Sequence, residues 1–133
     1  MPSVVEASRF FDTFTPGQTD AFLWDKTTCR APLGDLHIKA HLKGSGRLGI
    51  FPLTLDGRCK WGVIDLDGLS LAAVLALRQA GRDWGLDLPI EKSKSKGYHV
   101  WLFLDDWTPD AKVRAVLRGL IDTAGWGKHP IEI

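Results

Sequence analysis

The stretch Trp61-Gly-Val-Ile-Asp-Leu-Asp67 places an apolar run directly before two carboxylates that are separated by one residue. The aromatic and β-branched residues of this run are typical of a strand. Alternate side chains of a strand project from one face, so Asp65 and Asp67 would lie together and Leu66 would point the other way. Two neighbouring carboxylates are unfavourable without a cation between them, and hard oxygen ligands suit Mg2+ or Mn2+. We therefore predict a metal site, with a simple turn before Gly68 as the alternative.

A second polar cluster, Glu91-Lys-Ser-Lys-Ser-Lys-Gly-Tyr-His99, runs directly into the apolar stretch Val100–Leu104. Lysines and hydroxyl groups can bind phosphate, and a glycine lets the backbone approach a ligand closely. A solvated basic turn is the alternative interpretation. We predict a phosphate-binding site formed by Ser93, Lys94, Ser95, Lys96, Gly97 and His99.

The composition is that of an ordinary globular protein, with 44% hydrophobic and 25% charged residues among 133, so we expect one domain over residues 1–133. A net charge of +1 means that nucleic-acid binding would need a local basic patch. The Gly-rich segment Lys39–Arg47 is a candidate, with Lys43 and Arg47 as its contacts, and an exposed loop is the alternative. Two cysteines and no apolar run of membrane-spanning length favour a cytoplasmic protein without a membrane partner.

The apolar periodicity predicts an α+β fold with helices packed on a mainly antiparallel sheet. Residues 20–40 show no clear period and are expected to be irregular. Asp56-Gly57 predicts a hairpin between the runs 48–53 and 59–66. Thr108 and Pro109 predict the N-cap and first residue of a helix that ends at Gly125. The other expected elements are helices over 4–14 and 69–84 and strands over 88–92, 98–104 and 131–133.

Two further groups of residues have side chains suited to a site: four possible zinc ligands and three tryptophans. Cys29, His37, His41 and Cys59 do not have the spacing of a common structural zinc site, so we predict no zinc. Six tryptophans are many for a small domain, and most are expected in the core. Those outside the strongest patterns, which can stack on a base, are Trp24, Trp107 and Trp126.

Together these segments resemble the catalytic domain of archaeo-eukaryotic primases, the primase-polymerase superfamily. The resemblance is greatest to domains of prokaryotic mobile-element and conflict systems and of CRISPR-associated primase-polymerases. Bacterial end-joining polymerase domains share the layout more loosely. The resemblance covers about residues 35 to 133. It is carried by His41–Gly44 with Gly49–Pro52, by Val63–Asp67, by Glu91–Phe103, and by Ile131–Ile133 as the start of a further strand.

The resemblance implies an RRM-like core and a DNA primase or polymerase activity, a nucleotidyl transfer. Asp65, Asp67 and His99 would be the catalytic residues. The two aspartates would hold Mg2+ or Mn2+ between the triphosphate of a nucleoside triphosphate and the primer 3′-hydroxyl. The nucleotide would be bound by His99 together with Ser93, Ser95, Lys96 and Gly97. Lys43, Arg47 and Lys94 would follow a DNA template.

The chain departs from the family pattern at two points. Gly97 stands where a serine is common, so hydroxyl groups would come from Ser93 or Ser95. A third acidic residue on a later strand is missing, and Glu132 is a poor substitute. We therefore expect the N-terminal part of a catalytic domain, completed by a second chain or by a missing C-terminal region. The alternatives are a non-catalytic nucleotide- or nucleic-acid-binding module, and a metal-dependent nuclease or phosphoesterase that uses the same residues.

Overall fold

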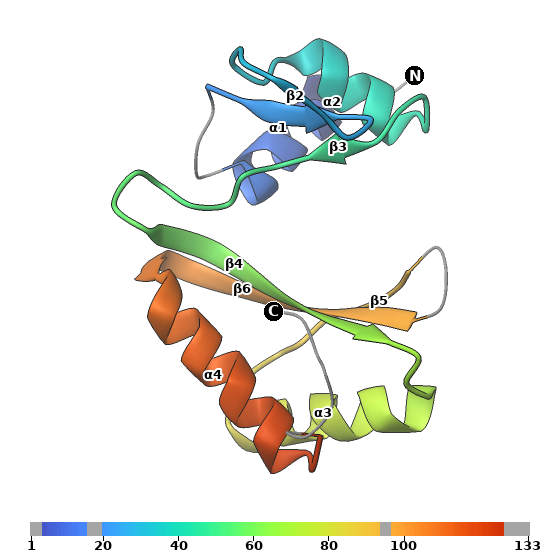
Figure 1. Cartoon of the computed structure of the whole chain (residues 1–133), viewed down its shortest axis with the longest axis vertical. Coiled ribbons are helices and arrows are strands. Elements are labelled where there is room, and N and C mark those ends of the chain that lie inside the picture. Colours follow the sequence, from blue (N-terminus) through green and yellow to red (C-terminus); the bar gives the residue numbers. More distant parts are fainter. Residues whose placement is uncertain (1–3, 16–19, 94–96, 127–133) are drawn as a thin grey trace. The chain divides into compact units, whose positions relative to one another are not determined.

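The computed structural model describes residues 4–15, 20–93 and 97–126, and the chain divides into two compact units, residues 1–59 and 60–133 (Figure 1). Each unit is described by itself. The single domain over 1–133 stays a prediction, because compactness alone does not show whether either unit folds without the other. Within the described ranges, no helix combines the length and apolarity that crossing a membrane requires.

The first unit is a three-stranded antiparallel sheet with two helices. Its sheet has the order β2-β1-β3, and its core centres on Phe22, Leu33 and Ile38. The helix expected over residues 4–14 is confirmed. The elements in chain order are α1 (Val4–Phe14), β1 (Phe22–Trp24), β2 (Thr27–Cys29), α2 (Asp35–Leu42) and β3 (Leu48–Gly49).

The expectation of irregular structure over residues 20–40 was wrong. This segment contains a hairpin of two three-residue strands and the eight-residue helix α2, all too short to show a period. The hairpin turns on Asp25 and Lys26, which both have positive φ (47° and 71°), as a two-residue type I′ turn requires. Neither is glycine, so the usual turn signal was absent. Arg47 supports the turn by donating its backbone N–H to Asp25 Oδ1 at 2.9 Å.

The hairpin predicted at Asp56-Gly57 was also wrong, although the turn itself forms. The backbone N–H of Thr54 donates to the Arg58 carbonyl at 2.8 Å, and Gly57 has φ +76°. The hydroxyl of Thr54 donates to Asp56 and holds the pKa of that exposed carboxyl below its ordinary value. However, β3 before the turn pairs with β1, while the strand after it joins the other sheet. Two apolar runs flanking a turn thus belong to different sheets.

The second unit has the order strand, helix, strand, strand, helix. Its sheet is ordered β4-β6-β5, so the third strand lies between the other two. This is the arrangement of a ferredoxin-like or RRM-like βαββαβ fold up to its last strand. The strand expected over 131–133 lies outside the described residues. The elements are β4 (Arg58–Asp67), α3 (Leu71–Asp83), β5 (Ile90–Lys92), β6 (Gly97–Pro109) and α4 (Asp110–Thr123).

Both helices of this unit cover the same face of the sheet (Figure 1). The covered face of β4 carries Ile64 and Leu66, which are 0% and 2% exposed. Gly62 allows the closest approach, since a Cβ there would lie 2.8 Å from Val113 of α4. The fold class is therefore α+β with antiparallel sheets, as predicted. The other buried apolar residues of this layer are Ala73, Val74, Leu77, Ala80, Leu88, Val100, Leu102, Leu117, Leu120 and Ile121.

Helix α4 begins one residue later than predicted. Pro109 is its N-cap and makes no side-chain cap bond, and its ψ of 134° keeps it outside the helix. Thr108, the predicted cap, belongs to β6 and donates its hydroxyl to the Asp106 carbonyl at 3.1 Å. The predicted end of the helix at Gly125 is confirmed. Its φ of +86° is the left-handed conformation that follows many helices and that glycine adopts without a steric penalty.

Candidate nucleotide and metal site

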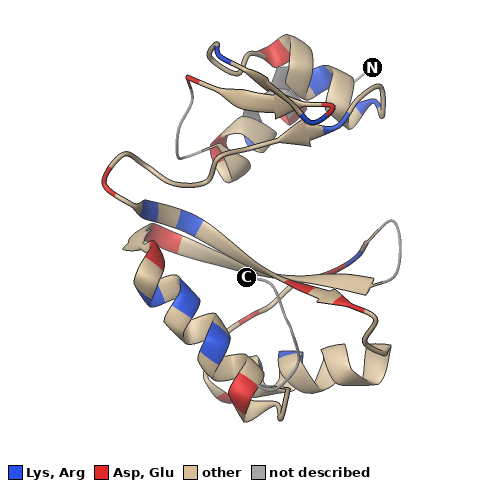
Figure 2. Cartoon of the chain, viewed as in Figure 1, with Lys and Arg blue, Asp and Glu red and all other residues tan. Residues whose placement is uncertain are grey.

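Asp65 and Asp67 lie at the end of β4, on the face opposite to the helices. Their neighbours Ile64 and Leu66 point into the core, while the Asp65 side chain is 35% exposed and Asp67 is exposed. Figure 2 shows acidic positions near the end of β4 and basic positions near its start. The alternation predicted for this strand therefore brings both carboxylates to one accessible face.

His99 lies beside Asp65 on the same face. The second-unit sheet places β6 between β4 and β5, so a side chain from β6 can reach both neighbours. His99 Nε2 is 3.7 Å from Asp65 Oδ1, and His99 Nδ1 is 2.8 Å from Glu91 Oε1. The imidazole therefore lies between a carboxylate of β4 and a carboxylate of β5.

Gly97 makes this approach of the two strands possible. A Cβ at this position would lie 2.1 Å from the carbonyl oxygen of Leu66, and that contact is with backbone rather than a movable side chain. Because the start of β6 faces the end of β4, the two strands run antiparallel and His99 is brought level with Asp65. The sequence suggested that Gly97 admits a ligand; the structure gives strand packing as the reason for glycine.

Ser93 is hydrogen-bonded to Gly97 at the start of β6. Its hydroxyl oxygen accepts the Gly97 N–H at 3.1 Å, and its backbone N–H donates to the Gly97 carbonyl at 2.9 Å. The Ser93 O–H remains able to donate, so nucleotide binding by this hydroxyl stays a prediction. Lys94, Ser95 and Lys96, which are also predicted to bind phosphate, lie outside the described residues.

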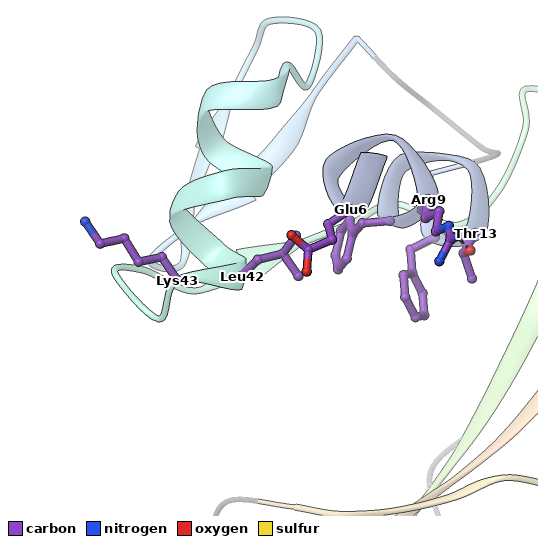
Figure 3. A pocket seen from close by; sticks show the side chains of 7 residues that line it. Glu6, Arg9, Thr13, Leu42 and Lys43 are labelled. Atoms are coloured by element: carbon purple, nitrogen blue, oxygen red, sulfur yellow. Dashed lines mark hydrogen bonds between the residues drawn. The ribbon is translucent and has the colours of Figure 1, made fainter. Parts of the chain in front are cut away.

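The remaining predicted basic contacts, Lys43 and Arg47, belong to the first unit. Both are exposed or partly exposed and follow α2, whose C-cap is Lys43. Lys43 also borders an open pocket of about 640 Å³ between α1 and α2, and Figure 3 shows Glu6, Arg9 and Leu42 along it. The sequence gave no signal for this pocket, which holds none of the predicted catalytic residues.

Of the zinc candidates Cys29, His37, His41 and Cys59, the two histidines contact aromatic rings and a backbone carbonyl. His37 packs against the rings of Phe22 and Trp24, at 4.7 and 4.9 Å between centroids. His41 Nδ1 is 3.1 Å from the Gly46 carbonyl. In the part of the chain that is described, no three His, Cys, Asp or Glu side chains are grouped to hold a metal ion.

The aspartates nevertheless fit a nucleotide-bound Mg2+ or Mn2+. In such sites Mg2+ keeps waters and takes one or two protein carboxylates, and phosphate oxygens supply other positions. Asp65 and Asp67 offer this donor type from one face, so a cage of three protein ligands is not required. The site therefore suits an ion that arrives with a triphosphate better than one that binds alone.

A row of aromatic rings continues from His99, and the sequence interpretation overlooked it. Trp101 and Phe103 are parallel within 4° at 5.7 Å, and Trp61 of β4 lies 5.3 Å from Trp101. The signal was present, since these residues alternate along their strands in phase with His99 and Asp65. By contrast, Trp24 packs in the first unit's core and Trp107 lies under Lys60 at 5.2 Å.

The fold and the candidate site define a class of protein: an RRM-like unit that carries acidic residues beside a histidine on the sheet face opposite to its own helices. Comparison with protein families identifies the family within this class. The chain matches the family described as "TOTE conflict system, Archaeo-Eukaryotic Primase domain" over residues 18–133, and it belongs to that family. This confirms the predicted primase-polymerase relationship and its conflict-system branch. No curated protein matches the chain.

The family is one of primase-type nucleotidyltransferases, whose domains generally use divalent metal ions and act on nucleotides and nucleic acid. The match spans both compact units, because it begins at residue 18 and extends to residue 133.

Proposed function

We propose that this chain is a primase-polymerase catalytic domain that adds nucleotides to a nucleic-acid strand on a DNA template. The observation that carries the proposal is the meeting of Asp65 and His99 at 3.7 Å on the helix-free face of an RRM-like sheet. Family membership makes nucleotidyl transfer the expected chemistry of such a face.

Each residue has a distinct role in the proposal. Asp65 and Asp67 hold Mg2+ or Mn2+, which supplies Lewis-acid stabilisation of the phosphoryl group when it is bound. His99 offers a nitrogen to the triphosphate from the side opposite to Glu91. Ser93, directly after β5, adds a hydroxyl donor, and Ser95 and Lys96 contribute phosphate contacts as the sequence predicts.

Nucleic acid would be held by basic side chains rather than by overall charge, which is only +1. Lys43 and Arg47 of the first unit, with Lys94, are proposed to contact the strand backbone. Such contacts with phosphate position a strand without reading its sequence.

Two carboxylates on β4 leave room for a third acid from a later strand or from a second chain. Mn2+, which tolerates imperfect coordination better than Mg2+, is therefore the metal of choice for a first assay.

The test is extension of a labelled primer on a DNA template with Mn2+ and nucleoside triphosphates. We expect extension by the wild type and none by Asp65→Asn, since the amide removes a charged metal ligand while keeping the shape. Asp87→Asn is the matched control, because Asp87 is an exposed aspartate that precedes β5 and has no proposed role in the site. Shortening of the strand would indicate a nuclease, and binding without turnover would indicate a non-catalytic module. Either result, or extension by Asp65→Asn, contradicts the proposal.

A further inference from the structure

We propose that the row of aromatic rings on the sheet of the second unit, Trp61, Trp101 and Phe103, is a stacking surface for the bases of a single nucleic-acid strand. The inference rests on the proposed function only for the choice of nucleic acid as the ligand. Neither the family match nor the sequence interpretation gives these rings a role, and the nucleic-acid contacts of the proposed function are all basic side chains.

Two neighbouring strands supply the rings. Trp101 and Phe103 alternate along β6 with Val100 and Leu102, which are 0% and 4% exposed in the core, so the rings lie on the face opposite to the helices (Figure 1). Trp61 comes from β4, the neighbour of β6, and its ring centroid is 5.3 Å from that of Trp101. Trp101 and Phe103 are parallel within 4° at 5.7 Å. The three rings thus form one continuous aromatic surface.

Packing in the core does not account for Phe103. The core of this unit lies on the other face of β6, whereas Phe103 is 42% exposed and Asp105, the next residue along its own face, is also exposed. Trp101 is oriented by its indole Nε1–H, which donates to Glu91 Oε1 at 3.4 Å, and by its stacking on Phe103. A base therefore meets rings that are already ordered, which lowers the entropy cost of binding.

The surroundings of the row favour bases as its ligand. Aromatic rings bind the flat face of every base, and the carboxylate of Glu91 beside Trp101 disfavours phosphate there. The row begins at His99, whose ring centroid is 6.5 Å from that of Trp101, so it continues the candidate nucleotide site along β6. Alternate residues of a strand are about 6.6 Å apart, so His99 to Phe103 spans about 13 Å, more than one base covers. A strand with several bases fits this length better than a single nucleotide.

The experiment measures binding of a fluorescent oligothymidine of about 15 nucleotides to the full chain by anisotropy, without metal or nucleoside triphosphate. A second oligonucleotide of equal length carries abasic sites in place of the bases, so it offers the same phosphates with nothing to stack. We expect the affinity for oligothymidine to fall by about 5–100-fold in Phe103→Ala, the usual effect of removing one stacking residue. Affinity for the abasic strand should be weak and equal in both proteins.

Three further variants serve as controls. Phe103→Tyr keeps a ring and should bind oligothymidine as the wild type does. Phe103→Leu keeps an apolar side chain without a ring and should show the loss, so the test does not depend on the stability of the alanine variant. Trp84→Ala removes another exposed aromatic residue of the same unit, 47% exposed at the C-cap of α3, and should leave the affinity unchanged.

The inference is overturned if the wild type does not bind oligothymidine, if Phe103→Leu binds it as tightly as the wild type, or if the abasic strand binds equally well. Because the assay needs no catalysis, the two proposals can fail separately. Primer extension by the wild type with unchanged strand binding in Phe103→Leu would refute only the stacking surface. Base-dependent binding that requires Phe103, without extension, would refute only the proposed function.

Discussion

At the scale of single residues, one histidine of this chain is assigned to nucleotide binding and another to packing, and one experiment can compare them. His99 lies on a partly exposed face between two carboxylates, whereas His37 packs between the rings of Phe22 and Trp24. We expect His99→Ala to weaken nucleotide binding by about 10–100-fold, the value of a hydrogen bond to a charged group, with little change in melting temperature.

His37→Ala should do the reverse, lowering the free energy of unfolding by about 1–3 kcal/mol through its two ring contacts while leaving nucleotide affinity unchanged. Calorimetric titration and thermal denaturation of both variants make the comparison. Equal effects of the two substitutions on binding would contradict the placement of His99 in the site.

Gly97 provides a second prediction at this scale. Gly97→Ser restores the serine that is common in the family, yet a Cβ at this position would meet the Leu66 carbonyl at 2.1 Å. We expect a loss of about 1–3 kcal/mol in unfolding free energy, measured by chemical denaturation, because strand backbones must move apart. Gly34→Ser is the matched control, since a Cβ there has no neighbour within 4 Å and serine is a good N-cap for α2. Equal stability of the two variants would show that the strands can separate without cost.

At the scale of elements, α3 depends on a capping residue that can be tested directly. The Ser70 hydroxyl accepts the Ala73 N–H at 3.3 Å at the start of this helix. Ser70→Ala should cost about 1 kcal/mol of unfolding free energy, while Ser70→Asp should retain it, because aspartate caps equally well. Urea denaturation of the three proteins measures this, and equal midpoints for serine and alanine would refute the capping role.

The elements also show why some of the fold was predictable. β4, α3 and α4 are long enough for alternation or a helical period to appear, and each formed where its apolar residues predicted. The strands β1 and β2 have three residues each and turn on Asp25 and Lys26, so neither a period nor a glycine marked them. β3 pairs with β1, which is distant in the sequence. The local turn signal at Asp56-Gly57 cannot predict such a long-range pairing.

The placement of the candidate site residues was predictable to a similar degree. Strand alternation put Asp65 and Asp67 on one face, and His99 stands at the start of the next apolar run. Their meeting, and the pairing of Glu91 with His99, depends on the strand order β4-β6-β5 and its register. Sequence spacing along one strand cannot supply such cross-strand relationships.

At the scale of the whole molecule, the exposed segment before β4, near the division between the two compact units, can be tested by proteolysis. Residues 50–57 contain no helix or strand, and Leu55 within them is 96% exposed. We expect brief chymotrypsin treatment of the folded chain to cut after Leu55, because proteases act on exposed loop segments. Mass spectrometry would identify fragments 1–55 and 56–133. The variant Leu55→Gln should lack this cut, and resistance of Leu55 in the wild type would contradict the described exposure.

Whether a metal ion binds alone or together with a nucleotide is a property of the whole chain. Asp65 and Asp67, the carboxylates proposed to hold the metal, both lie on β4 and offer the ion few protein ligands. We therefore expect metal to bind mainly together with a nucleotide, whose phosphates complete the coordination.

The most direct measurement is calorimetric titration of Mn2+ and a non-hydrolysable nucleoside triphosphate into the wild type, Asp65→Asn and Asp87→Asn. The account predicts joint binding by the wild type and Asp87→Asn, and an affinity reduced more than about tenfold in Asp65→Asn. Equal affinity of Asp65→Asn and the wild type, or no binding by either, would contradict it.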